Sequence, residues 1–109
     1  MKIYRGNRTS PCDVVVTVDG KPLKHIVYHS PTGFNWGYGG SGPADLALSI
    51  LADCFSSPLP TLNVVTKKWY QIFKREIVAS WEGEWWMITE DEIREWLVNK
   101  LKIQRREKP

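Results

Sequence analysis

A run of glycines, Gly37–Gly42 (GYGGSG), lies near the middle of the chain, and Pro43 follows it directly. Proline is favoured in the first turn of a helix, so Pro43 predicts that a helix begins here. Unpaired backbone amides at a helix N-terminus, together with the positive end of the helix dipole, bind phosphate or carboxylate groups. Because glycines leave these amides uncovered and the Ser41 hydroxyl adds a donor, the loop is a candidate anion site.

The same loop also has a purely structural interpretation, which the sequence leaves open. Glycines let a backbone pass close to bulky neighbours, here Phe34, Trp36 and Tyr38. The loop lacks the lysine of a phosphate-binding P-loop, and its spacing does not match the dinucleotide-binding fingerprint. If a ligand does bind, we expect it to contact the loop and the residues just before it: His29, Thr32, Trp36, Tyr38, Gly39, Gly40, Ser41 and Gly42.

Catalytic or metal chemistry would need residues that the sequence does not clearly bring together. His29, Ser41 and Asp45 would form an enzyme site only within hydrogen-bond reach of one another around a pocket, and the helix dipole alone accounts for Asp45. His25 and His29, four apart on an expected strand, suit a metal poorly, so we expect no metal and no cofactor. We therefore favour a binding protein over an enzyme and assign no catalytic residues.

Basic residues offer a second possible function. The chain has 15 lysines and arginines against 12 acidic residues, a net charge of +3, which permits a polyanionic partner without implying one. Cations on one side of the molecule would contact nucleic-acid phosphates, and any of the six tryptophans left exposed could stack on bases. The candidates are Lys67, Lys68, Lys74, Arg75, Lys102, Arg105 and Arg106. Interleaved acidic residues favour an ordinary solvated surface instead.

The chain's length of 109 residues and its 42% hydrophobic content indicate one core. We expect a single compact domain over residues 1–104 and a flexible basic tail over 105–109. The N-terminus has no signal-peptide pattern, and no apolar stretch approaches the roughly 20 residues of a membrane span, so a cytoplasmic location without a membrane is expected. Cys12 and Cys54 are expected to be free thiols, with Cys54 in the core.

The expected sheet begins with a hairpin. The β-branched run Asp13–Val18 precedes Asp19-Gly20, a dipeptide typical of two-residue turns, and Leu23–Tyr28 is expected to return as the second strand. Lys2–Arg5 is expected to be a short additional strand that ends before Gly6, and Trp85–Ile88 a later one.

Three helices should pack on this sheet. The first follows the glycine loop and is apolar over most of its circumference, which predicts a central, buried helix. The second is expected from about Val64 to Ser80, with Val65 and Trp69 on its buried face. Thr89-Glu90-Asp91-Glu92 matches a capping box and should start the third. The predicted fold class is therefore α+β, a small antiparallel sheet packed by three helices.

The segment His29–Leu51 (HSPTGFNWGYGGSGPADLALSIL) resembles the central motif of an uncharacterised family of small proteins found in bacteria and their phages. Two later stretches, Tyr70–Glu76 and Trp86–Trp96, resemble further blocks of that family. The resemblance implies a context, that of a phage or mobile-element accessory protein, and no activity. Our hypothesis is a binding protein that holds a protein partner or a small phosphate-bearing ligand at Gly37–Gly42. A nucleic-acid-binding protein and a small enzyme acting on a nucleotide are the alternatives.

Overall fold

The β-branched and aromatic segments of the chain form one antiparallel sheet, on which the helices pack. The computed structural model describes residues 1–11, 13–30, 33–55 and 64–107. Its strands are β1 (Ile3–Ser10), β2 (Asp13–Val18), β3 (Lys21–Pro22) and β4 (Trp85–Thr89), in the sheet order β3-β2-β1-β4. Its helices are α1 (Ser41–Phe55), α2 (Val64–Glu76) and α3 (Glu90–Glu107), with a short 3₁₀ turn at Val78–Ser80. The predicted α+β fold is confirmed.

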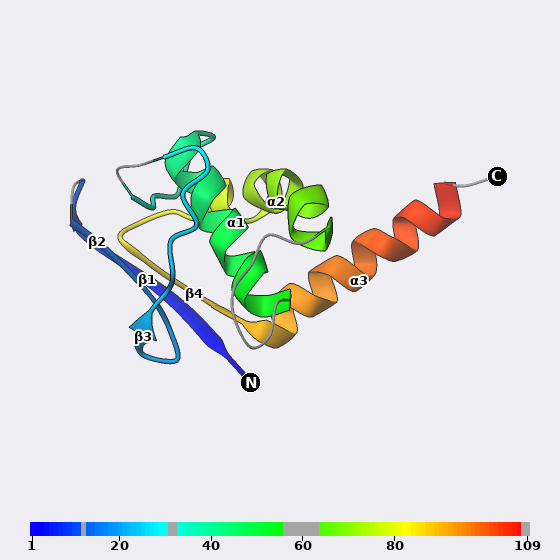
Figure 1. Cartoon of the computed structure of the whole chain (residues 1–109), viewed down its shortest axis with the longest axis horizontal. Helices are drawn as coiled ribbons and strands as arrows, with labels where there is room; N and C mark the ends of the chain where they lie inside the picture. Colours follow the sequence, from blue (N-terminus) through cyan, green and yellow to red (C-terminus); the bar gives the residue numbers. More distant parts are fainter. Residues whose placement is uncertain (12, 31–32, 56–63, 108–109) are drawn as a thin grey trace.

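Helix α1 lies at the centre of the molecule, between the sheet and helix α2 (Figure 1). Almost all of its residues are buried, including the apolar side chains of Leu46, Leu48, Ile50 and Leu51. This agrees with a helix that is apolar over most of its circumference. The glycine loop therefore leads into the most buried element of the fold.

The hairpin turn is confirmed, but the return strand is shorter than predicted. Asp19 and Gly20 have φ angles of 50° and 80°, as a two-residue turn of this kind requires. Strand β3 ends at Pro22, so the expected strand Leu23–Tyr28 was wrong. Side chains of helix α1 accept hydrogen bonds from the backbone amides of this segment, and those bonds replace a strand ladder.

Strand β1 is longer than predicted and runs through Gly6, which the sequence marks as a chain break. It is a central strand, paired with both β2 and β4. A Cβ atom at Gly6 would lie only 2.2 Å from Nε1 of Trp86, so glycine leaves room for the indole that crosses the strand. Here the glycine marks a close packing contact rather than a chain break.

Helix α2 ends at Glu76, earlier than the predicted Ser80, because the chain changes there to the 3₁₀ turn. Val65, expected on its buried face, is 39% exposed, whereas Trp69 is buried. Helix α3 begins after Thr89, as predicted: the Thr89 hydroxyl accepts from the Glu92 amide at 3.2 Å, and Glu92 accepts from the Thr89 amide at 3.2 Å.

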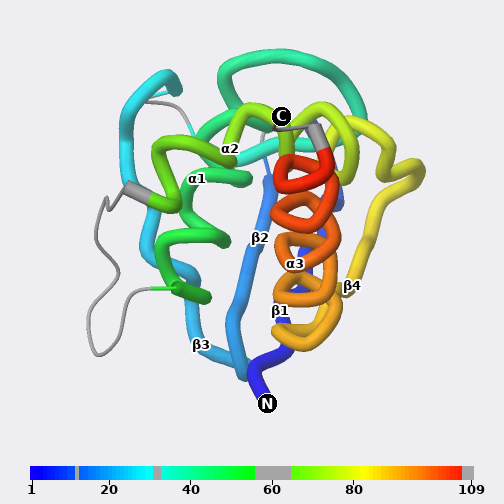
Figure 2. The backbone as a smooth tube through the Cα atoms, turned by 90° about the vertical axis from the view of Figure 1, so that its right-hand side faces the viewer, coloured from blue at the N-terminus to red at the C-terminus, as the bar shows by residue number. Residues whose placement is uncertain are grey.

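Helix α3 continues to Glu107 and so includes the first part of the expected tail. Its C-terminal half projects away from the rest of the molecule, which gives a longest dimension of 48 Å (Figure 1). Figure 2 shows the same helix from its C-terminal end, with the other elements behind it. None of the described helices is long and apolar enough to cross a membrane.

Candidate ligand-binding site

The glycine loop is fixed at both ends before it reaches helix α1. At its start, the indole N–H of Trp36 donates to the Gly83 carbonyl at 3.1 Å, and the side chain is only 1% exposed. The next residue, Gly37, has a φ of 86° and donates its amide to the Val78 carbonyl at 3.1 Å. At the other end, the Gly40 carbonyl accepts from the Ala44 amide at 3.0 Å and so begins the helical hydrogen bonding.

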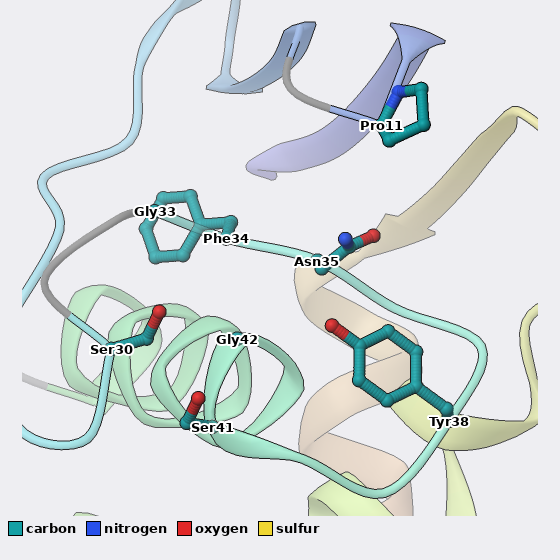
Figure 3. A pocket seen from close by; sticks show the side chains of 8 residues that line it. All are labelled: Pro11, Ser30, Gly33, Phe34, Asn35, Tyr38, Ser41 and Gly42. Carbon is teal, nitrogen blue, oxygen red and sulfur yellow. The ribbon is translucent and has the colours of Figure 1, made fainter.

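A pocket of about 220 Å³ lies between this loop and the first turn of α1 (Figure 3). The hydroxyl groups of Ser30, Ser41 and Tyr38 point toward it, and the rings of Phe34 and Tyr38 border it from different sides. Pro11, Gly33, Asn35 and Gly42 complete the lining. The lining side chains supply hydroxyl and amide groups and aromatic surface, and none of them carries a charge.

Two glycines in this loop differ sharply in their surroundings. A Cβ atom on Gly42 would lie 3.0 Å from Cβ of Asn35 and 3.5 Å from the Tyr38 hydroxyl, so it would enter the pocket. A Cβ atom on Gly39 would meet no atom within 4 Å. Alanine at these two positions therefore separates pocket filling from the general effect of removing a loop glycine.

Only some of the expected ligand residues line the pocket. Tyr38, Ser41 and Gly42 line the pocket. Gly39 and Gly40 lie in the loop between them, and a Cβ on Gly40 would be 2.7 Å from the Tyr38 ring. The side chains of Trp36 and His29 make other contacts: Trp36 is in the core, and the His29 ring hydrogen-bonds to the Tyr70 hydroxyl at 2.8 Å. Thr32 lies outside the described residues.

Asp45 has a different role from the one predicted. It lies beyond the first turn of α1, is 0% exposed, and accepts hydrogen bonds from the backbone amides of three consecutive residues, 28–30, at 2.8–3.3 Å. Its carboxylate also bonds to Nε2 of His25 at 2.9 Å. Burial raises the pKa of Asp45, but the bonds from His25 and the amides more than offset this and lower its pKa overall. The dipole interpretation was therefore wrong.

Asp45 and Ser49 together attach the segment before the pocket to helix α1. The Ser49 hydroxyl accepts from the Ile26 amide at 2.9 Å, one helical turn after Asp45. Four-residue spacing places both side chains on the same face of the helix. Because Ser30 is held by Asp45 and also lines the pocket, this attachment sets one wall of the candidate site.

The structure does not assemble His29, Ser41 and Asp45 into a catalytic group. The Asp45 carboxylate bonds to the other histidine, His25, while the His29 ring faces Tyr70. Within the described residues, no cluster of three or more histidine, cysteine or acidic side chains could hold a metal ion. Cys54 is a buried free thiol, and burial raises its pKa to about 11, which makes it a poor nucleophile.

Sequence reasoning missed several lining residues, namely Pro11, Ser30, Gly33, Phe34 and Asn35. Asn35 is held from the sheet, because the Arg8 guanidinium donates to its side-chain oxygen and stacks over the Trp36 ring at 4.7 Å. No local pattern indicates this long-range contact. The attachment through Asp45 and Ser49, by contrast, had a visible signal, because Ser41, Asp45, Ser49 and Asp53 form a row of polar residues, four apart, on a largely apolar helix.

The basic residues of the nucleic-acid alternative lie on helices α2 and α3. At 100° per residue, Lys67 and Lys74 share one side of α2, and Lys68 and Arg75 share an adjacent side. On α3, Lys102, Arg105 and Arg106 lie away from the side that carries Lys100 and faces α2. These cations therefore point in different directions, and nucleic-acid binding stays a prediction.

The comparisons with known proteins give a family without an activity. No curated protein and no solved structure is similar enough to the chain to count as a match. One family model, described as a family of unknown function (DUF6166), matches residues 4–99, which include all of the sheet except Ile3, the glycine loop and most of the helical part. The chain therefore belongs to the DUF6166 family of unknown function.

Proposed function

We propose that this protein is a binding protein that holds a small phosphate-bearing ligand in the pocket at the start of helix α1. The observation that carries the proposal is the pocket itself, where three side-chain hydroxyls and an amide meet the first turn of a helix. The phosphate would lie against the amides of Ser41 and Gly42. The rest of the ligand would lie between Phe34 and Tyr38.

Several properties of the pocket suit such a ligand. The first amides of a helix have no partner within the helix, and the helix dipole favours an anion there. No carboxylate lines the pocket to repel a phosphate. At about 220 Å³ it is smaller than the roughly 300–1,000 Å³ typical of sites for drug-sized molecules, so a nucleoside or sugar monophosphate would be only partly enclosed.

The same lining argues for binding without catalysis. Catalytic acids and bases are ionisable side chains placed at the reacting atoms, most often histidine or a carboxylate, and Tyr38 is the only ionisable side chain among the residues that line this pocket. On the resemblance of residues 29–51 alone, we further propose that the binding protein serves a phage or another mobile element.

Calorimetric titration with AMP, ribose 5-phosphate, inorganic phosphate and adenosine tests the proposal. We expect the phosphorylated compounds to bind and adenosine to bind more weakly. Gly42→Ala should weaken binding at least about tenfold, because its methyl group enters the pocket, whereas Gly39→Ala should leave it unchanged. Tyr38→Phe, which removes one hydroxyl from a half-exposed residue, should have an intermediate effect. Equal affinities for all three variants and the wild type would refute the site.

A further inference from the structure

A second concave surface lies on the opposite half of the helical layer, between α2 and the projecting part of α3. It is a groove of about 390 Å³, and the side chains that line it are Lys68, Trp69, Ile72, Arg75, Glu76, Lys100, Ile103 and Gln104. None of these residues lines the pocket at the start of α1. The groove is therefore independent of the proposed ligand site.

The apolar side chains that a partner could reach in the groove are aliphatic. Ile103, on helix α3, is 49% exposed, and Ile72, on helix α2, is half-buried. Trp69 is only 7% exposed, so its ring closes the bottom of the groove rather than standing free. Such a lining fits an inserted aliphatic or aromatic side chain better than a stacked nucleic-acid base, which needs an open ring face.

The charges around the groove are not balanced. Glu76 is already engaged, because it accepts from Lys100 and, at 3.2 Å, from the Trp96 indole. These contacts hold its pKa below the usual value, Lys100 being the main cause. Within the part of the chain that the structure describes, Lys68 and Arg75 have no salt-bridge partner, and both are exposed. Lys68, whose ammonium group lies over the Trp69 ring at 5.4 Å, Arg75 and Lys100 thus give the lining three positive charges against the single negative charge of Glu76.

We propose that the groove between α2 and α3 docks an amphipathic segment of a partner protein that carries acidic residues beside its apolar ones. An apolar side chain of the partner occupies the space between Ile72 and Ile103. Carboxylates of the partner pair with Lys68 and Arg75. Helices that lay an apolar face into a groove are a common form of peptide recognition, and complementary charge sets their orientation and rate of association.

Fluorescence anisotropy with two labelled model peptides tests this assignment. Both peptides carry leucines at helical spacing i, i+3, i+7; one has glutamates and the other lysines at the remaining positions. We expect the acidic peptide to bind below about 1 mM and the basic peptide not to bind. The double variant Lys68→Glu/Arg75→Glu should weaken binding at least about tenfold, since both contacts become repulsive.

Two further variants separate the groove from general charge and stability effects. Lys67→Glu/Lys74→Glu makes the same charge change on the neighbouring side of α2 and should have a clearly smaller effect. Ile103→Ser alters a half-exposed side chain on the projecting helix and should weaken binding without lowering the melting temperature appreciably. Equal weakening by the two double variants, or tight binding of the basic peptide, would overturn the proposal.

Two other occupants would also overturn it and are measured in the same series. If single-stranded DNA bound and lost affinity in Lys68→Glu/Arg75→Glu, the groove would be a nucleic-acid surface. If the protein dimerised in analytical ultracentrifugation and Ile103→Ser made it monomeric, the groove would be filled by a second copy. The peptide proposal predicts a monomer and no groove-dependent DNA binding.

Discussion

Replacing Asp45 with asparagine should loosen the segment that forms one wall of the pocket while leaving the fold intact. The buried carboxylate accepts from three consecutive backbone amides, those of residues 28–30, and bonds to His25. Asparagine keeps the shape of the side chain but has one acceptor oxygen instead of two. At least one buried amide therefore loses its acceptor, and the remaining bonds lose the contribution of the negative charge.

The size of the effect follows from these contacts. An unsatisfied buried amide costs about 1–3 kcal/mol, and hydrogen bonds to a charged group are worth roughly twice those to a neutral one. We expect Asp45→Asn to lower the free energy of unfolding by about 2–4 kcal/mol, out of the roughly 5–15 kcal/mol of a typical domain. The variant should remain folded, and the amides of residues 28–30 should exchange with solvent faster than in the wild type.

The same variant should change the response to acid. The pKa of Asp45 is lower in the folded protein than its ordinary value of 3.8, so its contribution to stability is complete above about pH 4. As the pH falls through 3.8 toward the folded-state pKa, the unfolded chain takes up the proton first and this contribution disappears. The difference in unfolding free energy between wild type and Asp45→Asn should therefore shrink below pH 4.

Urea unfolding followed by tryptophan fluorescence at pH 7 and at pH 3 measures both effects. Asp91→Asn, at an exposed acidic residue in the first turn of α3, is the matched control and should cost well under 1 kcal/mol. A loss for Asp45→Asn of less than about 0.5 kcal/mol, equal to the control, would show that the carboxylate does not hold this segment. So would a difference from the wild type that does not depend on pH.

Gly37, Thr89 and Cys54 each make a contact that a single substitution or labelling experiment tests. Gly37→Ala should lower the free energy of unfolding by at least about 1–3 kcal/mol, measured by thermal unfolding. Gly37 has a φ of 86°, and a Cβ atom there would lie 2.9 Å from a backbone carbonyl oxygen. Gly39→Ala, whose Cβ would meet no atom within 4 Å, should be nearly neutral. Thr89→Ala should cost about 1 kcal/mol by removing the helix cap, and Thr89→Ser should restore most of it. In a Cys12→Ser background, iodoacetamide should modify Cys54 only at the rate of global unfolding, because the thiol is buried and burial raises its pKa to about 11. Fast labelling of the native protein would contradict this.

Features encoded by neighbouring residues were predictable from the sequence. The Asp19-Gly20 turn, the start of α3 at its capping box and the burial of α1 all follow from a dipeptide, a tetrapeptide or a periodic pattern. In each case the deciding interactions lie within a few residues of one another. Local chemistry and the final fold agree at these places.

The errors arose where a distant contact overrode a local preference. The segment Leu23–Tyr28, with Ile26 and Val27, would suit a strand, but Asp45 and Ser49 of helix α1 bind two of its amides instead. Gly6 looks like a chain break, yet it lies within β1 because Trp86 needs the space of its missing side chain. Five of the eight residues that line the pocket were likewise unforeseen; Phe34 and Asn35, for example, reach it only through the folding of the loop over the helix.

The most direct test of a ligand site at the start of α1 is a two-dimensional NMR titration of the ¹⁵N-labelled protein with AMP. We expect saturable shifts of the backbone amides of Ser41 and Gly42 and of the amide of Tyr38. Those shifts should be absent in Gly42→Ala and retained in Gly39→Ala. No shift at millimolar AMP, or shifts confined to helices α2 and α3, would contradict a ligand site there.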